Sequence, residues 1–139
     1  MNTLLLFISI IYSVTTPQHL AEKGTGQATS DEAVSVIAMY MYADWCGACQ
    51  AIKPKMEKAK LEFEEQPVLF VKMNMTNKFT AHQSKLLATQ LGLSEIFKKK
   101  QGMTGFVLLI NADTNEVINK ITTDDDVTDI VKKVTDAMS

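Results

Sequence analysis

The feature that most constrains this chain is a cysteine pair, Cys46 and Cys49, set between an apolar run and a helix-favouring segment. The apolar run covers residues 36–42, and its nearly continuous apolar character predicts a central parallel strand covered on both faces. The segment that follows, residues 50–65, predicts a helix. Cys46 would then lie where strand passes into helix, and the free N–H groups and dipole of that helix would favour a thiolate.

The spacing of the two cysteines predicts redox chemistry. Two intervening residues place Cys49 one helical turn after Cys46, close enough to close a small disulfide ring that opens and closes by thiol–disulfide exchange. A structural zinc site is disfavoured, because it needs four ligands and only His19 and His82, far apart in the sequence, could add to the pair. A purely structural disulfide is also disfavoured, because so short a loop constrains the unfolded chain very little.

Composition sets the scale of the protein and excludes one class of partner. With 139 residues, 46% of them apolar, the chain is long enough for one domain and a short leader. All 14 basic residues are lysine, against 16 acidic residues, so the charge balance gives no indication of nucleic-acid binding. Two cysteines at a single spacing form a working pair, not the framework of a disulfide-rich miniprotein.

The N-terminal part of the chain predicts export. Residues 4–14 are mostly apolar, but a span of the bilayer needs about 20 residues, so they fit the hydrophobic part of a signal peptide. No lysine precedes them and no clear cleavage site follows. We therefore expect residues 1–16 to be a signal peptide or a short membrane anchor, with a buried helix as the other possibility, and residues 17–33 to be a linker. Export would place the protein outside the cytoplasm, in a periplasm or a secretory pathway.

Beyond the first helix, the pattern alternates between strand and helix. Residues 68–74 predict a strand parallel to the first one, since a strand–helix–strand unit implies a parallel pair. Thr80 and Gln83 predict a capping box that opens a helix. The stretch 93–101, which contains three consecutive lysines, predicts a solvated loop, with a place beside the cysteine pair as the minor possibility.

The C-terminal third predicts a hairpin and a helix. Residues 106–110 and 117–121 predict two antiparallel strands. Thr123 and Asp126 predict a capping box for the last helix, whose apolar positions keep helical spacing. The expected fold is therefore α/β, with the cysteine pair at the carboxyl end of the central strand. The expected strand order in the sheet is 68–74, 36–42, 105–111, 116–121.

The stretch Tyr42-Ala43-Asp44-Trp45-Cys46-Gly47-Ala48-Cys49, with Pro54 five residues after the second cysteine, resembles the thioredoxin superfamily. The residue sequence of this motif is most similar to that of the thioredoxin-like C-terminal domain of DsbD-type interchange proteins and of membrane-tethered thioredoxin-like proteins of photosynthetic membranes. The resemblance runs over residues 34–139. It implies a thioredoxin-like domain, with a central mixed four-stranded sheet flanked by helices on both faces, in a trimmed form.

The resemblance also implies roles for the residues of the motif. Cys46 would attack a substrate disulfide and Cys49 would resolve the mixed disulfide. Trp45 would shield the face around the pair, while Gly47 and Ala48 would permit close approach of the substrate and tune the reduction potential.

The chain departs from the family at Thr104, which stands where thioredoxins carry a cis-proline that faces the disulfide. A cis bond before a residue other than proline costs about 2.5–4 kcal/mol, so we expect a trans or rearranged loop. The family uses the backbone of this loop to bind an extended substrate segment, a role that the resemblance carries to Met103 and Thr104. Without the proline ring, the two sulfurs would be more open to adventitious metal.

The second departure is Tyr40, at the position where the family has a buried aspartate that handles the proton of the second cysteine. A tyrosine, with a reference pKa of about 10, cannot act as a carboxylate base at neutral pH. It would be a hydrogen-bond donor or a core aromatic, and the core role is favoured. Lys72 matches the lysine beside that aspartate and would favour a nearby thiolate.

The expected activity is therefore thiol–disulfide oxidoreduction, an enzyme that reduces protein disulfides without a cofactor or a bound metal. Its partners would be a disulfide-bearing protein substrate and an upstream thiol donor, and we expect a monomer. Two alternatives stay open. One is a Cu(I) chaperone module that holds the ion with the two cysteines and Met103, because soft sulfur ligands suit that ion. The other is a disulfide oxidase or isomerase, since the direction of electron flow depends on a potential that the sequence does not give.

Overall fold

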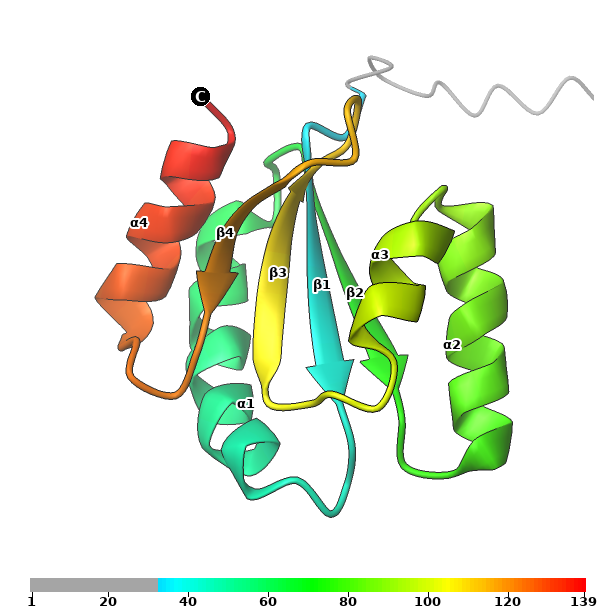
Figure 1. Ribbon diagram of the computed structural model, residues 1–139. Coiled ribbons are helices and arrows are strands. Elements are labelled where there is room, and N and C mark those ends of the chain that lie inside the picture. Colours follow the sequence, from blue (N-terminus) through cyan, green and yellow to red (C-terminus); the bar gives the residue numbers. More distant parts are fainter. Residues whose placement is uncertain (1–32) are drawn as a thin grey trace, which may run out of the picture. The chain divides into compact units, whose positions relative to one another are not determined.

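Figure 1 shows the computed structural model, which describes residues 33–139. The leader predicted for residues 1–16, and the predicted linker as far as residue 32, lie outside the described residues. The elements, in chain order, are β1 (Val36–Tyr42), α1 (Gly47–Lys60), the short 3-10 helix η1 (Leu61–Phe63), β2 (Val68–Asn74), α2 (Lys78–Gln90), α3 (Ser94–Lys100), β3 (Phe106–Asn111), β4 (Val117–Ile121) and α4 (Val127–Ala137).

The four strands form one mixed sheet in the order β2-β1-β3-β4. β1 runs parallel to β2, with Tyr40 opposite Lys72, and antiparallel to β3, with Tyr40 opposite Val107. β3 and β4 form the antiparallel hairpin. The predicted α/β architecture and strand order are therefore confirmed. β1 and β3 are the two inner strands, and all seven residues of β1 are buried.

Alternation along β1 divides the interior into two cores, because successive side chains of a strand point to opposite faces. The even-numbered residues join α1 and α4 in what we call the α1/α4 core, and the odd-numbered residues join α2 and α3 in the α2/α3 core. Figure 1 shows these two pairs of helices on either side of the sheet. Both faces of β1 are covered, as its continuous apolar run predicts.

The N-terminus of α2 differs from the prediction. The helix begins at Lys78, and its N-cap is Asn77, whose side chain accepts hydrogen bonds from the N–H groups of Phe79 at 2.9 Å and Thr80 at 3.0 Å. The Thr80 hydroxyl oxygen accepts in return from the Asn77 N–H at 3.1 Å. The predicted Thr80–Gln83 capping box was therefore wrong, because an upstream asparagine, at least as good an N-cap as threonine, starts the helix three residues earlier.

The cap of α4 was misplaced in the opposite direction. Asp126 is the N-cap and accepts from the Asp129 N–H at 2.8 Å, while the Asp129 carboxylate accepts from the Asp126 N–H at 3.1 Å. The predicted Thr123–Asp126 box was wrong by three residues. Two carboxylates at the start of α4 also favour this register, because they meet the positive end of the helix dipole.

The lysine-rich stretch 93–101 is not a loop, and this prediction was wrong. It forms α3, which is anchored by the buried side chain of Phe97 in the α2/α3 core. Its three lysines lie in the last turn, where cations complement the negative end of the helix dipole. Among residues 33–139, no helix combines the length and the apolar character that crossing a membrane requires.

Candidate active site

The cysteine pair lies directly after the carboxyl end of β1, where the chain turns into α1 (Figure 1). Cys46 is the N-cap of α1, and its sulfur accepts a hydrogen bond from the Cys49 N–H at 3.2 Å. The turn before it is closed by the Cys46 N–H, which donates to the Ala43 carbonyl at 3.1 Å. The structure thus brings the first sulfur to the free N–H groups of a helix N-terminus, as the strand-to-helix pattern predicts.

The two sulfurs differ in their access to solvent. Cys46 is 8% exposed, whereas Cys49 is fully buried, with its sulfur 3.7 Å from the Met41 carbonyl oxygen. Both are free thiols in the structure. Of the two residues, Cys46 alone therefore retains some contact with solvent.

The two thiols also differ in acidity. Burial works against ionisation of Cys46, but hydrogen bonds from the Cys49 thiol, the Thr104 hydroxyl and the N–H groups of Cys49 and Ala48 together hold its pKa below the ordinary value. Burial raises the pKa of Cys49, and its hydrogen bond with Cys46 and the charge of Cys46 raise it further. The pair therefore ionises at Cys46 first.

The loop before β3 passes directly over the pair, and Gly105 is a functional residue that the sequence reasoning missed. Its φ is +88°, its N–H donates to the Met41 carbonyl at 2.9 Å, and a Cβ atom there would lie 2.7 Å from the Ala48 Cβ and 3.4 Å from the Cys46 sulfur. No side chain fits at this position unless Ala48 or the loop moves. A glycine next to the position of the family's cis-proline is the sequence signal that could have identified it.

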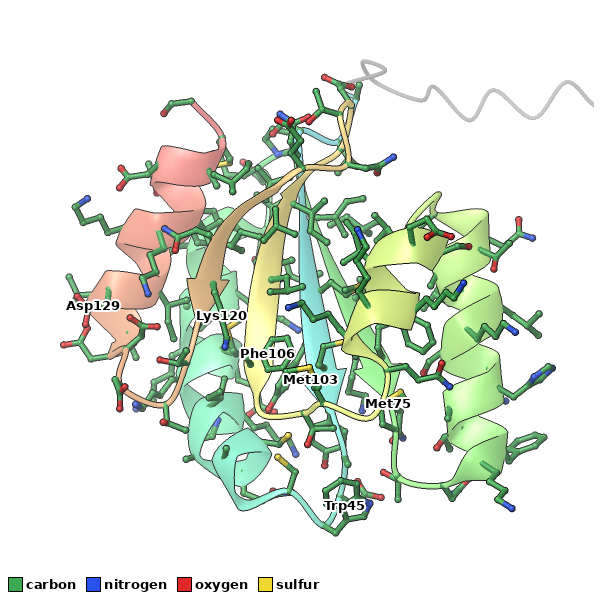
Figure 2. All side chains as sticks on the ribbon, in the orientation of Figure 1. Trp45, Met75, Met103, Phe106, Lys120 and Asp129 are labelled. Carbon is green, nitrogen blue, oxygen red and sulfur yellow. The ribbon has the colours of Figure 1, made fainter. Side chains whose placement is uncertain are left out.

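The predicted substrate-binding residues lie in this loop. Thr104 is half-buried, and Met103 is 48% exposed at the edge of the site (Figure 2). Every peptide bond in residues 33–139 is trans, as expected for a chain with threonine in place of the proline.

Tyr40 is both a core residue and a hydrogen-bond donor. Its hydroxyl donates to the Cys49 carbonyl at 2.7 Å, and its ring packs edge-on against Tyr42, with 5.5 Å between the ring centroids. Burial raises the pKa of Tyr40, and the nearby Cys49 thiol raises it further. The hydroxyl therefore stays protonated at neutral pH, and it orients the second cysteine without serving as a base.

Trp45 projects from the turn and is 64% exposed (Figure 2). Its indole N–H donates to the Thr76 carbonyl at 3.1 Å, and the Thr76 hydroxyl oxygen accepts from the Asp44 N–H at 3.0 Å. Thr76, in the β2–α2 connection, is thus a second residue that sequence reasoning missed. It ties the turn that carries Trp45 to the neighbouring strand. A Cβ at Gly47 would meet nothing within 4 Å, so the close approach in the site occurs at Ala48.

The structure places the Lys72 side chain next to Tyr42. Its side chain is exposed, and its ammonium group lies over the Tyr42 ring, 4.9 Å from the ring centroid. His82 is exposed on α2. Within the part of the chain that the structure describes, no three His, Cys, Asp or Glu side chains gather into a metal-binding group.

One comparison with known proteins finds a family that matches part of this chain. The family model described as Thioredoxin matches residues 25–89. A comparison with curated proteins finds no match.

Solved structures with a similar chain path include three proteins of low sequence identity. A thiol:disulfide interchange protein of the thioredoxin family from Chlorobium tepidum TLS is 17% identical, with a TM-score of 0.49 over 75% of this chain and 79% of that one. Trxlp from Edwardsiella tarda EIB202 is 11% identical, with a TM-score of 0.48 over 73% and 82%. A mutant thioredoxin from Halobacterium salinarum NRC-1 is 19% identical, with a TM-score of 0.46 over 76% of each chain.

These identities and scores are too low to carry an argument about function. The four-stranded mixed sheet with helices on both faces is a thioredoxin-like fold. This fold and the close cysteine pair at the start of α1 agree with the match of the Thioredoxin family model to residues 25–89.

Proposed function

We propose that this protein is a thiol–disulfide oxidoreductase that reduces protein disulfides, with Cys46 as the nucleophile and Cys49 as the resolving thiol. The observation that carries the proposal is the unequal pair: the pKa of Cys46 is lowered and its sulfur is within reach, whereas the pKa of Cys49 is raised and its sulfur is buried. The thiolate is the attacking form in disulfide exchange, so the accessible sulfur is also the activated one.

The reaction has two exchange steps. The Cys46 thiolate attacks one sulfur of a substrate disulfide, so that a mixed disulfide forms and one substrate thiolate leaves. Cys49 then gives up its proton and attacks the Cys46 sulfur, which breaks the mixed disulfide and releases the second substrate thiolate. Two electrons pass from the pair to the substrate, and an upstream thiol donor returns the Cys46–Cys49 disulfide to the dithiol.

The structure supports the order of these steps. The charge of Cys46 is one cause of the raised pKa of Cys49, so the second thiol stays protonated while the first is a thiolate. Formation of the mixed disulfide removes that charge. Cys49 therefore becomes easier to ionise at the moment when its attack is needed, and the buried pair requires no separate carboxylate to time the reaction.

We place this activity outside the cytoplasm, in a monomer similar to DsbD-type or membrane-tethered thioredoxin-like proteins. The apolar stretch 4–14 supports a location outside the cytoplasm, and the residue sequence of the cysteine motif supports the similarity to these proteins. Immunoblotting of fractionated cells tests the location, and a full-length product in the cytosolic fraction would contradict it. The equilibrium of the pair with a glutathione buffer gives its reduction potential, and a strongly oxidising value would assign it to disulfide formation.

The test of the activity is the reduction of insulin by the full chain with dithiothreitol as electron donor. We expect Cys46→Ser to abolish the turnover above the dithiothreitol background. Cys49→Ser should stop after the first step and accumulate a mixed disulfide that mass spectrometry detects at Cys46. Turnover by Cys46→Ser at the wild-type rate would refute the proposal, and a Cu(I) competition titration on the reduced protein then tests the chaperone alternative.

A further inference from the structure

A groove on the α1/α4 side of the sheet lies between α1 and the strands β1 and β2, with a volume of about 220 Å³. Its β1 wall consists of Ala38, Tyr40 and Tyr42, which are buried members of the α1/α4 core. Met56 of α1 and Phe70 of β2 add further apolar surface to the lining. An apolar cavity of about 150 Å³ is enough to hold benzene, so this groove has room for one aromatic ring.

The rim of the groove carries more positive than negative charge. Three lysines line it, namely Lys53, Lys60 and Lys72, which we call the rim lysines, against one carboxylate, that of Glu57. Glu57 lies 3.8 Å from the Lys53 ammonium. Among residues 33–139, neither Lys60 nor Lys72 forms an ion pair. An apolar floor beside an excess of positive charge is complementary to an anion that carries an apolar body.

The ammonium groups of these two lysines lie over aromatic rings of the lining. The Lys60 ammonium is 5.2 Å from the centroid of the Phe70 ring. The Lys72 ammonium is 4.9 Å from the centroid of the Tyr42 ring. Attraction to the ring faces holds both charges at the wall of the groove. An aromatic ligand there would meet rings with which it can pack and cations that attract its negative charge.

We propose that this groove binds a small aromatic carboxylate, with its ring against the apolar lining and its charge at the rim lysines. A free aromatic acid and the C-terminal aromatic residue of a peptide share this chemistry. The room for a single ring favours the free acid. The inference does not depend on the proposed function, because the groove lining includes neither cysteine.

The experiment is a titration of the isotope-labelled, reduced full chain with phenylacetate, followed by two-dimensional NMR. Phenylacetamide is the uncharged probe of nearly the same shape, and acetate is the charged probe without a ring. We expect phenylacetate to shift the amide signals of the groove residues in a saturable way. Phenylacetamide should bind at the same residues about fivefold more weakly, the upper range for an exposed ion pair, and acetate should not saturate them. Added salt should weaken only the binding of phenylacetate.

Three variants locate the charge and the ring contacts. Lys60→Gln and Lys72→Gln each remove one ammonium group and keep most of the side-chain length, and each should weaken phenylacetate about threefold without affecting phenylacetamide. Phe70→Leu should weaken both aromatic probes. Lys58→Gln is the matched control, because that exposed lysine of α1 does not line the groove, and it should bind both probes as wild type does.

Equal affinities for phenylacetate and phenylacetamide would overturn the proposal, and so would an unchanged affinity for phenylacetate in the folded double variant Lys60→Gln/Lys72→Gln. Shifts no larger in the groove than at the lysines of α3 would show non-specific ion binding only, and would overturn it as well. Tighter binding of N-acetylphenylalanine than of phenylacetate would reassign the groove to the chain end of a peptide. The titration uses no disulfide, so failure of insulin reduction would count against the proposed function alone.

Discussion

Both faces of the sheet are buried, but the two cores on them differ in the kinds of side chain that they contain. The α2/α3 core consists of apolar side chains, among them Met39, Met41, Met73 and Phe97. The α1/α4 core contains both cysteines and the two tyrosines of β1. Neighbouring residues of one strand, Met39 and Tyr40, thus belong to different environments, because the side chains of a strand alternate between its faces.

The difference shows that the chemistry is confined to one side of the central strand. The polar groups buried in the α1/α4 core are hydrogen-bonded, as with the Tyr40 hydroxyl on the Cys49 carbonyl. The α2/α3 core meets the site through the main chain of Met41, whose carbonyl accepts from the Cys49 thiol at 3.7 Å and from the Gly105 N–H at 2.9 Å. We therefore expect changes in the α2/α3 core to alter stability and changes around the cysteines to alter reactivity.

The largest expected effect comes from a cavity in the α2/α3 core. Phe97→Ala removes a fully buried ring and should lower the free energy of unfolding by about 3–5 kcal/mol in chemical denaturation. Phe79→Ala is the matched control, because that ring is 71% exposed on α2, and it should cost less than about 0.5 kcal/mol. The pH midpoint of Cys46 alkylation should stay at the wild-type value in both variants. A shifted midpoint in folded Phe97→Ala would show that the two cores are coupled.

A smaller effect is expected at the ion pair that joins the turn between β4 and α4 to α4 itself. Asp125 lies 2.7 Å from the Lys133 ammonium, and its carboxylate accepts from the Thr122 N–H at 2.8 Å. Although burial opposes ionisation, these partners and the charge of Lys55 hold the pKa of Asp125 below its ordinary value. A depressed pKa stabilises the fold above the unfolded-state pKa of about 3.9, and this contribution is lost as the pH falls through the lower folded-state value.

Asp125→Asn should therefore cost about 2 kcal/mol at neutral pH, as expected for hydrogen bonds to a charged group. The difference from wild type in denaturant unfolding should shrink as the pH is lowered below about 4. Asp124→Asn is the control, because this neighbouring side chain is exposed. A difference that persists unchanged into acid would mean that the carboxylate charge is not the cause.

Much of this organisation could be predicted from the sequence, because it depends on periodicity. The boundaries of β1 and β2 follow apolar runs, and the strand order follows from parallel and hairpin connections. The cap residues of α2 and α4 were misplaced, because several polar residues compete for each helix start and only the register of the packed helix decides among them. Phe97 shows the same limit, since one buried ring turns a lysine-rich stretch into a helix.

The candidate site was predictable only in part. The cysteines and Thr104 stand in recognisable positions, but Gly105 and Thr76 act through contacts between segments that are far apart in the sequence. The contact of the Lys72 ammonium with the Tyr42 ring could not be predicted either, because it depends on how two neighbouring strands pair. Tyr40 could be assigned to the core by its position, but its hydrogen bond to the main chain of Cys49 depends on the path of α1.

The smallest expected effect is on stability, and it distinguishes the two tyrosine hydroxyls of the α1/α4 core, those of Tyr40 and Tyr42. Tyr40→Phe removes only the hydroxyl that donates to the Cys49 carbonyl, and one buried hydrogen bond contributes about 1 kcal/mol to the free energy of unfolding. Tyr42→Phe is the matched control, since the Tyr42 hydroxyl only accepts a long 3.4 Å bond from the Gln50 amide. Its cost should be smaller than that of Tyr40→Phe.

Because Tyr40 orients the second cysteine, its loss should also lengthen the lifetime of the mixed disulfide formed at Cys46, measured by rapid acid quench and mass spectrometry during insulin reduction. Tyr42→Phe should leave that lifetime unchanged. Equal lifetimes in wild type and Tyr40→Phe, together with a loss of stability, would reduce Tyr40 to a core residue. The α1/α4 core would then differ from the α2/α3 core only in its two sulfurs and in the loop residues that contact them.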